Sequence, residues 1–163
     1  MCRDRTTAAS RPPAPKPRAS RRKLTTPDYQ ALGAFRHSLR KFLAFSEAGS
    51  AALGLTPQQH QALLAVRAHS GTEAMTVGEL ADVLLIRNHS ALGLVERLIE
   101  RGLMTRAASP QDRRRVLLYL TVDGAHQLER ISRSNLGQLK STLPVFTDLL
   151  RALEQLELPP PSD

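Results

Sequence analysis

Residues 87–121 read RNHSALGLVERLIERGLMTRAASPQDRRRVLLYLT. Apolar spacing predicts a helix that begins at about Asn88 and stops at Gly102. Residues 103–106 and 116–120 follow as two short predicted strands, and the loop between them contains three consecutive arginines. A helix, a strand, an arginine-tipped hairpin and a second strand form the layout of a winged helix-turn-helix. In that fold a helix enters one DNA groove and the hairpin reaches the next.

Positive charge is concentrated in two segments of the chain. The 163 residues carry a formal net charge of +8 and are expected to form one domain with a real core. Residues 1–26 hold eight Lys/Arg against one acid, and residues 87–115 hold seven against three. The other two parts have a slight excess of acid. A basic patch on a balanced domain is the electrostatic signature of nucleic-acid binding.

The sequence lacks the motifs that mark several classes of function. We expect no enzyme, because the chain has no Gly-rich phosphate loop, nucleophile motif or paired carboxylates. The single cysteine, Cys2, excludes an intrachain disulfide, and the five histidines lack ligand spacing, so we expect no metal or other cofactor. No apolar run approaches the roughly 18 residues that span a bilayer, and no signal-peptide core is present. We therefore expect a cytoplasmic protein without a membrane partner.

Residues 1–26 form a Pro/Arg-rich segment with almost no large apolar side chains. Such a segment cannot bury enough surface to offset its ordering entropy, so we predict a disordered basic tail. Two interpretations stay open: the tail adds non-specific phosphate contacts, or it reflects a wrongly chosen start codon or a solubilising leader. Residues 27–158 are predicted to form the folded domain.

Two long helical stretches are predicted at the ends of this domain. Thr26-Pro27 is a cap followed by a first-turn proline, and Gly49 interrupts the helical pattern that follows. Thr121 is expected to cap a second long stretch. Pro144 is expected to interrupt that stretch and to separate a last helix from it.

Capping boxes predict two shorter helices between them. Thr56 with Gln59, and Thr76 with Glu79, have the spacing at which the cap and the third helical residue satisfy each other's backbone N–H groups. A turn at residues 85–87 then leads into the helix that begins at Asn88, which makes a helix-turn-helix. The predicted core stripe of the helix that begins at Asn88 consists of Ala91, Leu94, Val95 and Leu98.

Five short motifs follow one another in a familiar order. They are Leu55-Thr56-Pro57-Gln58-Gln59, Leu80-Ala81-Asp82 through Leu98, Arg101-Gly102-Leu103, Asp112-Arg113-Arg114, and Leu120-Thr121 with Gly124. With these motifs the chain resembles the MarR family of bacterial transcriptional regulators. The resemblance covers roughly residues 28–157, and the hairpin followed by Leu-Thr-x-x-Gly is its most specific part.

The resemblance implies a mainly α (α+β) fold: a winged helix-turn-helix with N- and C-terminal dimerisation helices and a two-stranded wing. The DNA-binding lobe would span about residues 56–121, and the dimerisation helices about residues 27–48 and 122–157. It further implies a homodimer that represses transcription from a palindromic operator on double-stranded DNA. Many members release DNA when a small aromatic molecule binds. The alternative is a helical interaction protein whose basic segment binds RNA or protein.

Departures from the family pattern affect the recognition helix. The family often has Ser at the position of Arg87, Thr at that of Leu92 and Arg at that of Gly93. The middle of the helix is therefore stripped of polar groups here, and base reading is expected to shift to its start. Redox-sensing members use a cysteine in the first helix, which this chain lacks, so thiol sensing by the folded body is excluded.

The start of the recognition helix is the expected base-reading site. Donors and acceptors gather there at the positive end of the helix dipole, in Arg87, Asn88, His89 and Ser90. Asn88 can pair bidentately with adenine, and Arg87 or His89 can donate to guanine. In the alternative interpretation Asn88 only caps the helix and His89 is a solvated surface residue. Arg97 is expected on an exposed face of the same helix.

The hairpin tip is the second expected DNA contact. Arg113, Arg114 and Arg115 are hard to explain by packing, and arginines gain from the negative potential of a narrow minor groove. The resemblance implies that Arg114 is the minor-groove contact and that Asp112 orients an arginine of the wing. Arg106 is expected to contact a phosphate. A solvated, charged turn is the alternative.

Two further positions have open interpretations. Thr76 is expected to cap its helix and can also donate to a phosphate. His60 lies on the apolar face of its helix, where the family commonly has an aromatic residue. It is either a satisfied core histidine or part of an effector pocket with Phe35, Leu39 and Phe42.

Overall fold

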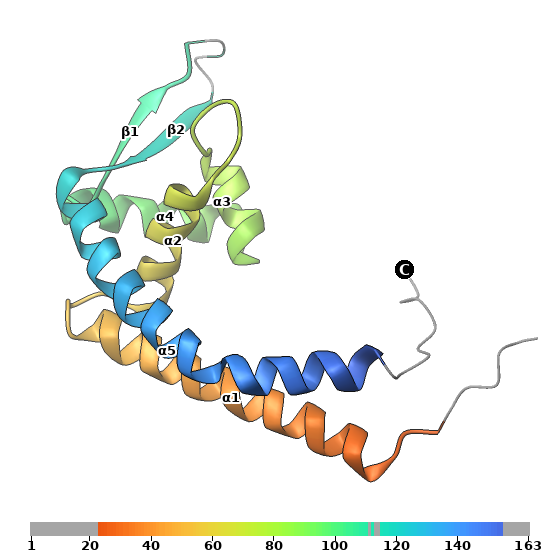
Figure 1. Cartoon of the computed structure of the whole chain (residues 1–163). Coiled ribbons are helices and arrows are strands. Elements are labelled where there is room, and N and C mark those ends of the chain that lie inside the picture. The colour runs from red at the N-terminus through yellow and green to blue at the C-terminus, as the bar shows by residue number, and fades with distance from the viewer. Residues whose placement is uncertain (1–22, 111, 113–114, 155–163) are drawn as a thin grey trace, which may run out of the picture.

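The computed structural model describes residues 23–110, 112 and 115–154. Within these residues, five helices and one two-stranded sheet follow one another (Figure 1). They are α1 (Thr26–Ala51), α2 (Pro57–Ala68), α3 (Val77–Leu84), α4 (Asn88–Glu100), β1 (Met104–Ala108), β2 (Val116–Leu120) and α5 (Val122–Glu154). The expected mainly helical fold with a two-stranded wing is confirmed.

The elements form a compact lobe and a long arm. In Figure 1, α2, α3, α4 and the hairpin gather at one end, while α1 and the C-terminal part of α5 lie side by side and extend away from them. A ring contact and a hydrogen bond are among the contacts that join the helices of the arm. The rings of Phe35 and Phe146 pack edge to face with their centroids 5.6 Å apart. Asn135 Nδ2 donates to Ser46 Oγ at 2.9 Å.

The core of the lobe joins the apolar faces of α2, α3 and α4 with side chains from the wing strands and from the start of α5. All four residues of the predicted α4 stripe are buried, and Leu63 and Leu80 from the two preceding helices are fully buried with them. The capping boxes at Thr56 and Thr76 are both present. Local signals therefore predicted these helices correctly.

The first helix differs from its prediction at both ends. Its cap is Thr25 rather than Thr26, because the backbone N–H of Thr25 donates to the Asp28 carboxylate at 2.7 Å. The helix also continues through Gly49 to Ala51. A glycine costs a helix only about 1 kcal/mol, and the fully buried Ser50 holds this turn in place with a bond from its Oγ to Ser46 O.

The wing strands pair antiparallel, with Met104 opposite Leu120 and Ala108 opposite Val116. The prediction of two strands is confirmed, although β1 runs two residues further toward the tip than expected. The base of the hairpin is tied to the segment before α3, because Leu118 N donates to Met75 O at 2.8 Å. The wing therefore has a fixed attachment to the helix-turn-helix.

The start of α5 explains the Leu-Thr-x-x-Gly motif. Thr121 Oγ1 accepts a bond from Gly124 N at 3.0 Å and donates to Gly102 O at 2.7 Å, while Thr121 N donates to Leu103 O. A Cβ atom at Gly124 would lie 1.9 Å from Leu103 O. Only glycine fits where the first turn of α5 meets the end of the recognition helix.

The predicted interruption at Pro144 is wrong, because α5 is a single helix from Val122 to Glu154 with Pro144 inside it. A proline removes one helical N–H and crowds the preceding turn, but it does not forbid helix when tertiary contacts hold both sides. Here Asn135 before Pro144 and Phe146 after it both contact α1. Packing along α1 therefore outweighs the local penalty.

Candidate nucleic-acid interface

A turn with an unusual backbone joins α3 to α4. Leu85 has φ +54°, in the left-handed region, and is the one non-glycine residue with positive φ among those described. The next residue, Ile86, donates its N–H back to Ala81 O at 3.0 Å. Leu85 thus ends α3 and turns the chain into α4, although its own side chain is 92% exposed.

The start of α4 is exposed over its first four positions. Arg87 is the cap residue, with extended backbone and no side-chain capping bond, and Asn88 is the first helical residue. The interpretation of Asn88 as the cap is therefore wrong. The side chains of Arg87, Asn88, His89 and Ser90 are all exposed at the positive end of the helix. Arg97 is exposed two turns later on the same helix.

The tip of the wing falls partly outside the described residues. Arg113 and Arg114 are among those left out, so their expected DNA contacts stay predictions. Asp112 is described: its carbonyl oxygen accepts from Arg115 N at 2.9 Å, and its N–H donates to Ser109 Oγ at 3.4 Å. Arg106 is exposed on β1, opposite Leu118.

Arg115 has carboxylate partners that sequence reasoning did not find. Its Nη1 lies 2.8 Å from Glu73 Oε2, and its Nη2 lies 3.9 Å from Glu79 Oε1. Glu73 Oε1 also accepts from the buried Ser109 Oγ at 3.2 Å. Glu73, in the loop before α3, therefore contacts the residues on both sides of the hairpin loop, and we name this set of contacts the wing clamp. No local pattern links Glu73 to residues 36 and 42 positions away, so the sequence had no signal for it.

Thr76 is a cap in the structure. Its Oγ1 accepts from Glu79 N at 3.3 Å and donates its proton to Glu79 Oε2 at 2.7 Å. Bonds from the backbone and the side chain of Thr76 lower the pKa of Glu79 below its ordinary value. Glu79 is therefore ionised beside Arg115, and the Thr76 hydroxyl proton is already engaged.

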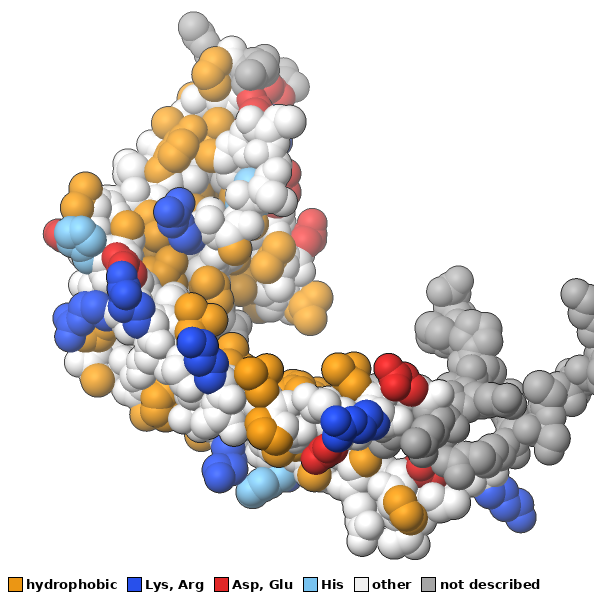
Figure 2. All heavy atoms as spheres, viewed as in Figure 1, with side chains coloured by type: hydrophobic (Ala, Val, Ile, Leu, Met, Phe, Trp, Pro, Cys, Tyr) orange, Lys and Arg blue, Asp and Glu red, His pale blue; other side chains and the backbone are white. Residues whose placement is uncertain are grey.

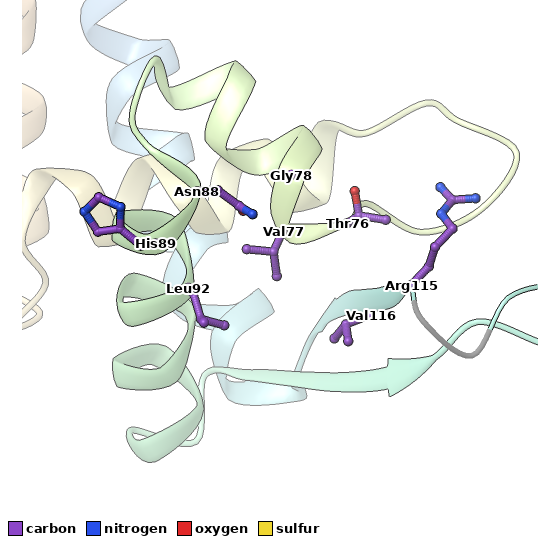
Figure 3. Close-up of a pocket in the computed structure, with 8 residues that line it drawn as sticks. All are labelled: Thr76, Val77, Gly78, Asn88, His89, Leu92, Arg115 and Val116. Carbon is purple, nitrogen blue, oxygen red and sulfur yellow. The ribbon is translucent and has the colours of Figure 1, made fainter.

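A groove of about 560 Å³ lies between the recognition helix and the wing. It is lined by Thr76, Val77, Gly78, Asn88, His89, Leu92, Arg115 and Val116. Figure 3 shows Asn88 and Leu92 extending from α4 toward Val77 and Val116, while His89 points to the other side of the helix. The groove thus has an apolar floor of Val77, Leu92 and Val116 and a polar rim.

The residues expected to line an effector pocket lie on two helices. Phe35 packs against Phe146, Leu39 is 39% exposed, and Phe42 is half-buried, all on α1. His60 on α2 is buried, as its spacing predicts, but its Nε2 has no hydrogen-bond partner. Burial lowers the pKa of His60 below its ordinary value. His60 is therefore a buried histidine with an unsatisfied nitrogen, not a satisfied one.

Two further features are absent from the part of the chain that the structure describes. No group of three or more His, Cys, Asp or Glu side chains there is arranged to hold a metal ion. None of the helices over the same residues combines the length and the apolar character that crossing a membrane requires.

Known proteins are similar to this chain in sequence and in fold. A sequence profile of the MarR family matches residues 53–115. The organic hydroperoxide resistance transcriptional regulator of Bacillus subtilis (strain 168) is 32% identical over 111 residues, which cover 60% of this chain and 74% of that protein. A putative transcriptional regulatory protein for the hcr operon of Thauera aromatica is 29% identical over 103 residues, 63% of this chain and 60% of that one.

Solved structures of MarR and MepR proteins have a fold similar to that of this chain. Wild-type MarR from E. coli in its apo form has a TM-score of 0.58 at 26% identity, over 76% of this chain and 90% of that one. A Listeria monocytogenes MarR has a TM-score of 0.57 at 27% identity, over 74% and 80%. A S. aureus MepR mutant bound to an oligodeoxyribonucleotide shares the fold with a TM-score of 0.58 at 24% identity, over 74% and 83%. The chain belongs to the MarR family of winged helix-turn-helix transcriptional regulators, which are DNA-binding proteins and not enzymes.

Proposed function

We propose that the protein is a homodimeric repressor that binds a palindromic operator. The observation that carries this proposal is the exposed, uncapped start of α4 beside a wing that the clamp holds in place. A recognition helix and a fixed hairpin can then engage adjacent grooves of one duplex. The DNA-binding lobe is assigned to about residues 56–121, within a folded domain of residues 27–158.

The dimer interface is assigned to α1 and α5. Leu136, Leu143 and Leu150 recur every seven residues along α5 and are 57–60% exposed. Leu32 and Leu39 on α1 have the same spacing and are also exposed. Figure 2 shows apolar side chains along the arm that these helices form. A seven-residue repeat keeps leucines on one helical face, and such a face is stable in water when another helix covers it.

Contacts with DNA divide into two sets. Arg87, Asn88, His89 and Ser90 are assigned to base edges and nearby phosphates in the major groove. The wing supplies Arg114 to the minor groove, with Arg113 beside it and Asp112 as the positioning residue. Arg97 and Arg106 are assigned to phosphates. Arg115 contributes mainly through the clamp, because Glu73 and Glu79 already offset its charge.

A small aromatic molecule is proposed as the signal that releases DNA. The support is the unsatisfied Nε2 of the buried His60, in the first turn of α2. Phe35, Leu39 and Phe42 on α1 are the apolar candidates for the same site. Thermal-shift assays with phenolic compounds, repeated on His60→Leu, test this assignment.

The central experiment is a mobility shift against duplex DNA, with Arg114→Ala as the test variant. Wild-type protein should bind one palindrome in the presence of competitor DNA. The variant should bind it more weakly, with a salt slope smaller by about 0.9 for each phosphate that the arginine no longer neutralises. The same protein should sediment as a dimer. Binding to RNA or protein without a preferred duplex would instead support the helical interaction protein.

A further inference from the structure

The groove beside the recognition helix has an apolar floor that core packing does not explain. Leu92 is 42% exposed and Val116 is 36% exposed, and both line the groove. The side of α4 that packs into the core is already occupied by the buried stripe of Ala91, Leu94, Val95 and Leu98. Leu92 therefore offers an apolar side chain to whatever enters the groove.

Leu92 shares its face with the proposed base-reading residue Asn88. The two are four residues apart in α4, and Figure 3 shows both extending to the same side of the helix, toward Val77. A ligand that meets the Asn88 amide therefore also meets the Leu92 methyl groups. That ligand must combine a polar edge with a small apolar group.

Double-stranded DNA offers this combination at A·T pairs. Adenine presents N6 and N7 to an asparagine amide, and the thymine C5-methyl is the apolar group that bases expose in the major groove. The charge at the start of α4 also suits DNA, because the exposed Arg87 lies beside Asn88.

We propose that Leu92, supported by Val77 and Val116, reads the methyl group of an operator thymine. The proposal rests on the operator binding proposed above and adds a base preference to it. Asn88 and Leu92 are separated by a rise of about 6 Å along the helix, and stacked bases by about 3.4 Å. The thymine therefore lies within about two base pairs of the adenine that Asn88 contacts.

The test is a thymine-to-uracil scan of the operator. Deoxyuridine removes only the C5-methyl and keeps base pairing, charge and the sugar. Burial of one methyl group corresponds to about a fourfold change in affinity. Wild-type protein should lose about fourfold at one thymine of each half-site. Leu92→Ala should bind the thymine operator more weakly and should show no loss at that position.

Leu85→Ala is the matched control, because Leu85 is an exposed leucine outside the groove and its replacement should preserve the uracil effect. Specific binding with no uracil-sensitive position would overturn the thymine assignment and leave the operator function standing. A uracil effect that persists at full size in Leu92→Ala would also overturn it. Failure to bind any duplex specifically would overturn the proposed function itself.

Discussion

At the scale of single residues, Leu85 combines a strained backbone with an exposed side chain. Its left-handed backbone brings a Cβ close to a carbonyl oxygen, which costs an L-residue about 1–2 kcal/mol, and its side chain is 92% exposed. We expect Leu85→Gly to raise the free energy of unfolding by about 1 kcal/mol, because glycine adopts this conformation without the clash. Leu85→Ala keeps the Cβ and should leave stability unchanged. Chemical denaturation of both variants decides whether the strain is real.

His60 gives the folded protein a pH dependence. Burial lowers its pKa from the ordinary value of 6.5, so the unfolded chain takes up a proton at a higher pH than the folded chain does. The contribution of His60 to stability is then constant well above pH 6.5 and falls as the pH drops from 6.5 toward the lower folded pKa. One proton contributes at most about 1.4 kcal/mol per pH unit.

His60→Gln should remove this contribution. We expect the free energies of unfolding of the variant and the wild type, measured by denaturation, to approach each other as the pH falls from about 7.5 to about 5.5. The difference at the upper end of this range measures the packing cost of the substitution alone. A constant difference across the range would mean that His60 takes up no proton on unfolding.

At the scale of elements, the wing clamp decides how firmly the hairpin is held. Glu73→Gln removes the charge that pairs with Arg115, while an amide oxygen remains to accept from Ser109. Partly exposed ion pairs contribute up to about 1 kcal/mol, so local opening of the hairpin should become up to about fivefold more frequent. We expect faster hydrogen exchange at the Ser109 and Arg115 amides, both of which are bonded within the hairpin.

Glu100→Gln is the control for this prediction, because it removes one negative charge from α4 at a distance from the clamp in sequence. It should leave exchange in the hairpin unchanged. Arg115→Lys combined with Glu73→Gln should exchange less rapidly than the sum of the two single effects predicts, since both variants weaken the Arg115–Glu73 contact. Fully additive effects would show that the two side chains hold the wing independently.

The junction between β2 and α5 makes a second prediction at this scale. Gly124→Ala places a Cβ against the backbone oxygen of Leu103, which no side-chain rotation can relieve. We expect a loss of about 2–3 kcal/mol in the free energy of unfolding. Gly33→Ala on α1 is the control, because nothing lies within 4 Å of its added Cβ, and it should stabilise the helix slightly. Equal stability of the two variants would contradict the close approach.

The same elements mark what sequence could and could not predict. The capping boxes at Thr56 and Thr76 and the apolar stripe of α4 depend on residues three or four positions apart, and all were predicted correctly. Pro144 was misinterpreted because its environment is set by α1, which lies far away in the chain. Glu73 was missed for the same reason, since its partners belong to the wing. Features set by residues three or four positions apart could be predicted from the sequence, whereas contacts between elements far apart in the chain could not.

At the scale of the whole molecule, the exposed leucines of α5 would link the fold to DNA recognition through the proposed dimer. A palindromic operator requires a two-fold dimer whose recognition helices are held about one DNA turn apart. We expect Leu143→Asp to give folded monomers, because this side chain is 57% exposed within one chain and its replacement costs the subunit little. The variant should keep helical circular dichroism and sediment at half the mass. It should bind a single half-site weakly. Its affinity for the full palindrome should be no higher than its affinity for one half-site.

Ser134→Asp adds the same charge to an exposed position of α5 outside the leucine repeat, and it should remain a dimer. This pair of variants separates the interface from a general effect of charge on the arm. A Leu143→Asp protein that stayed dimeric would place the interface elsewhere. A monomer with undiminished affinity for the palindrome would show that the two recognition helices bind independently, because linkage through a dimer is the source of the extra affinity.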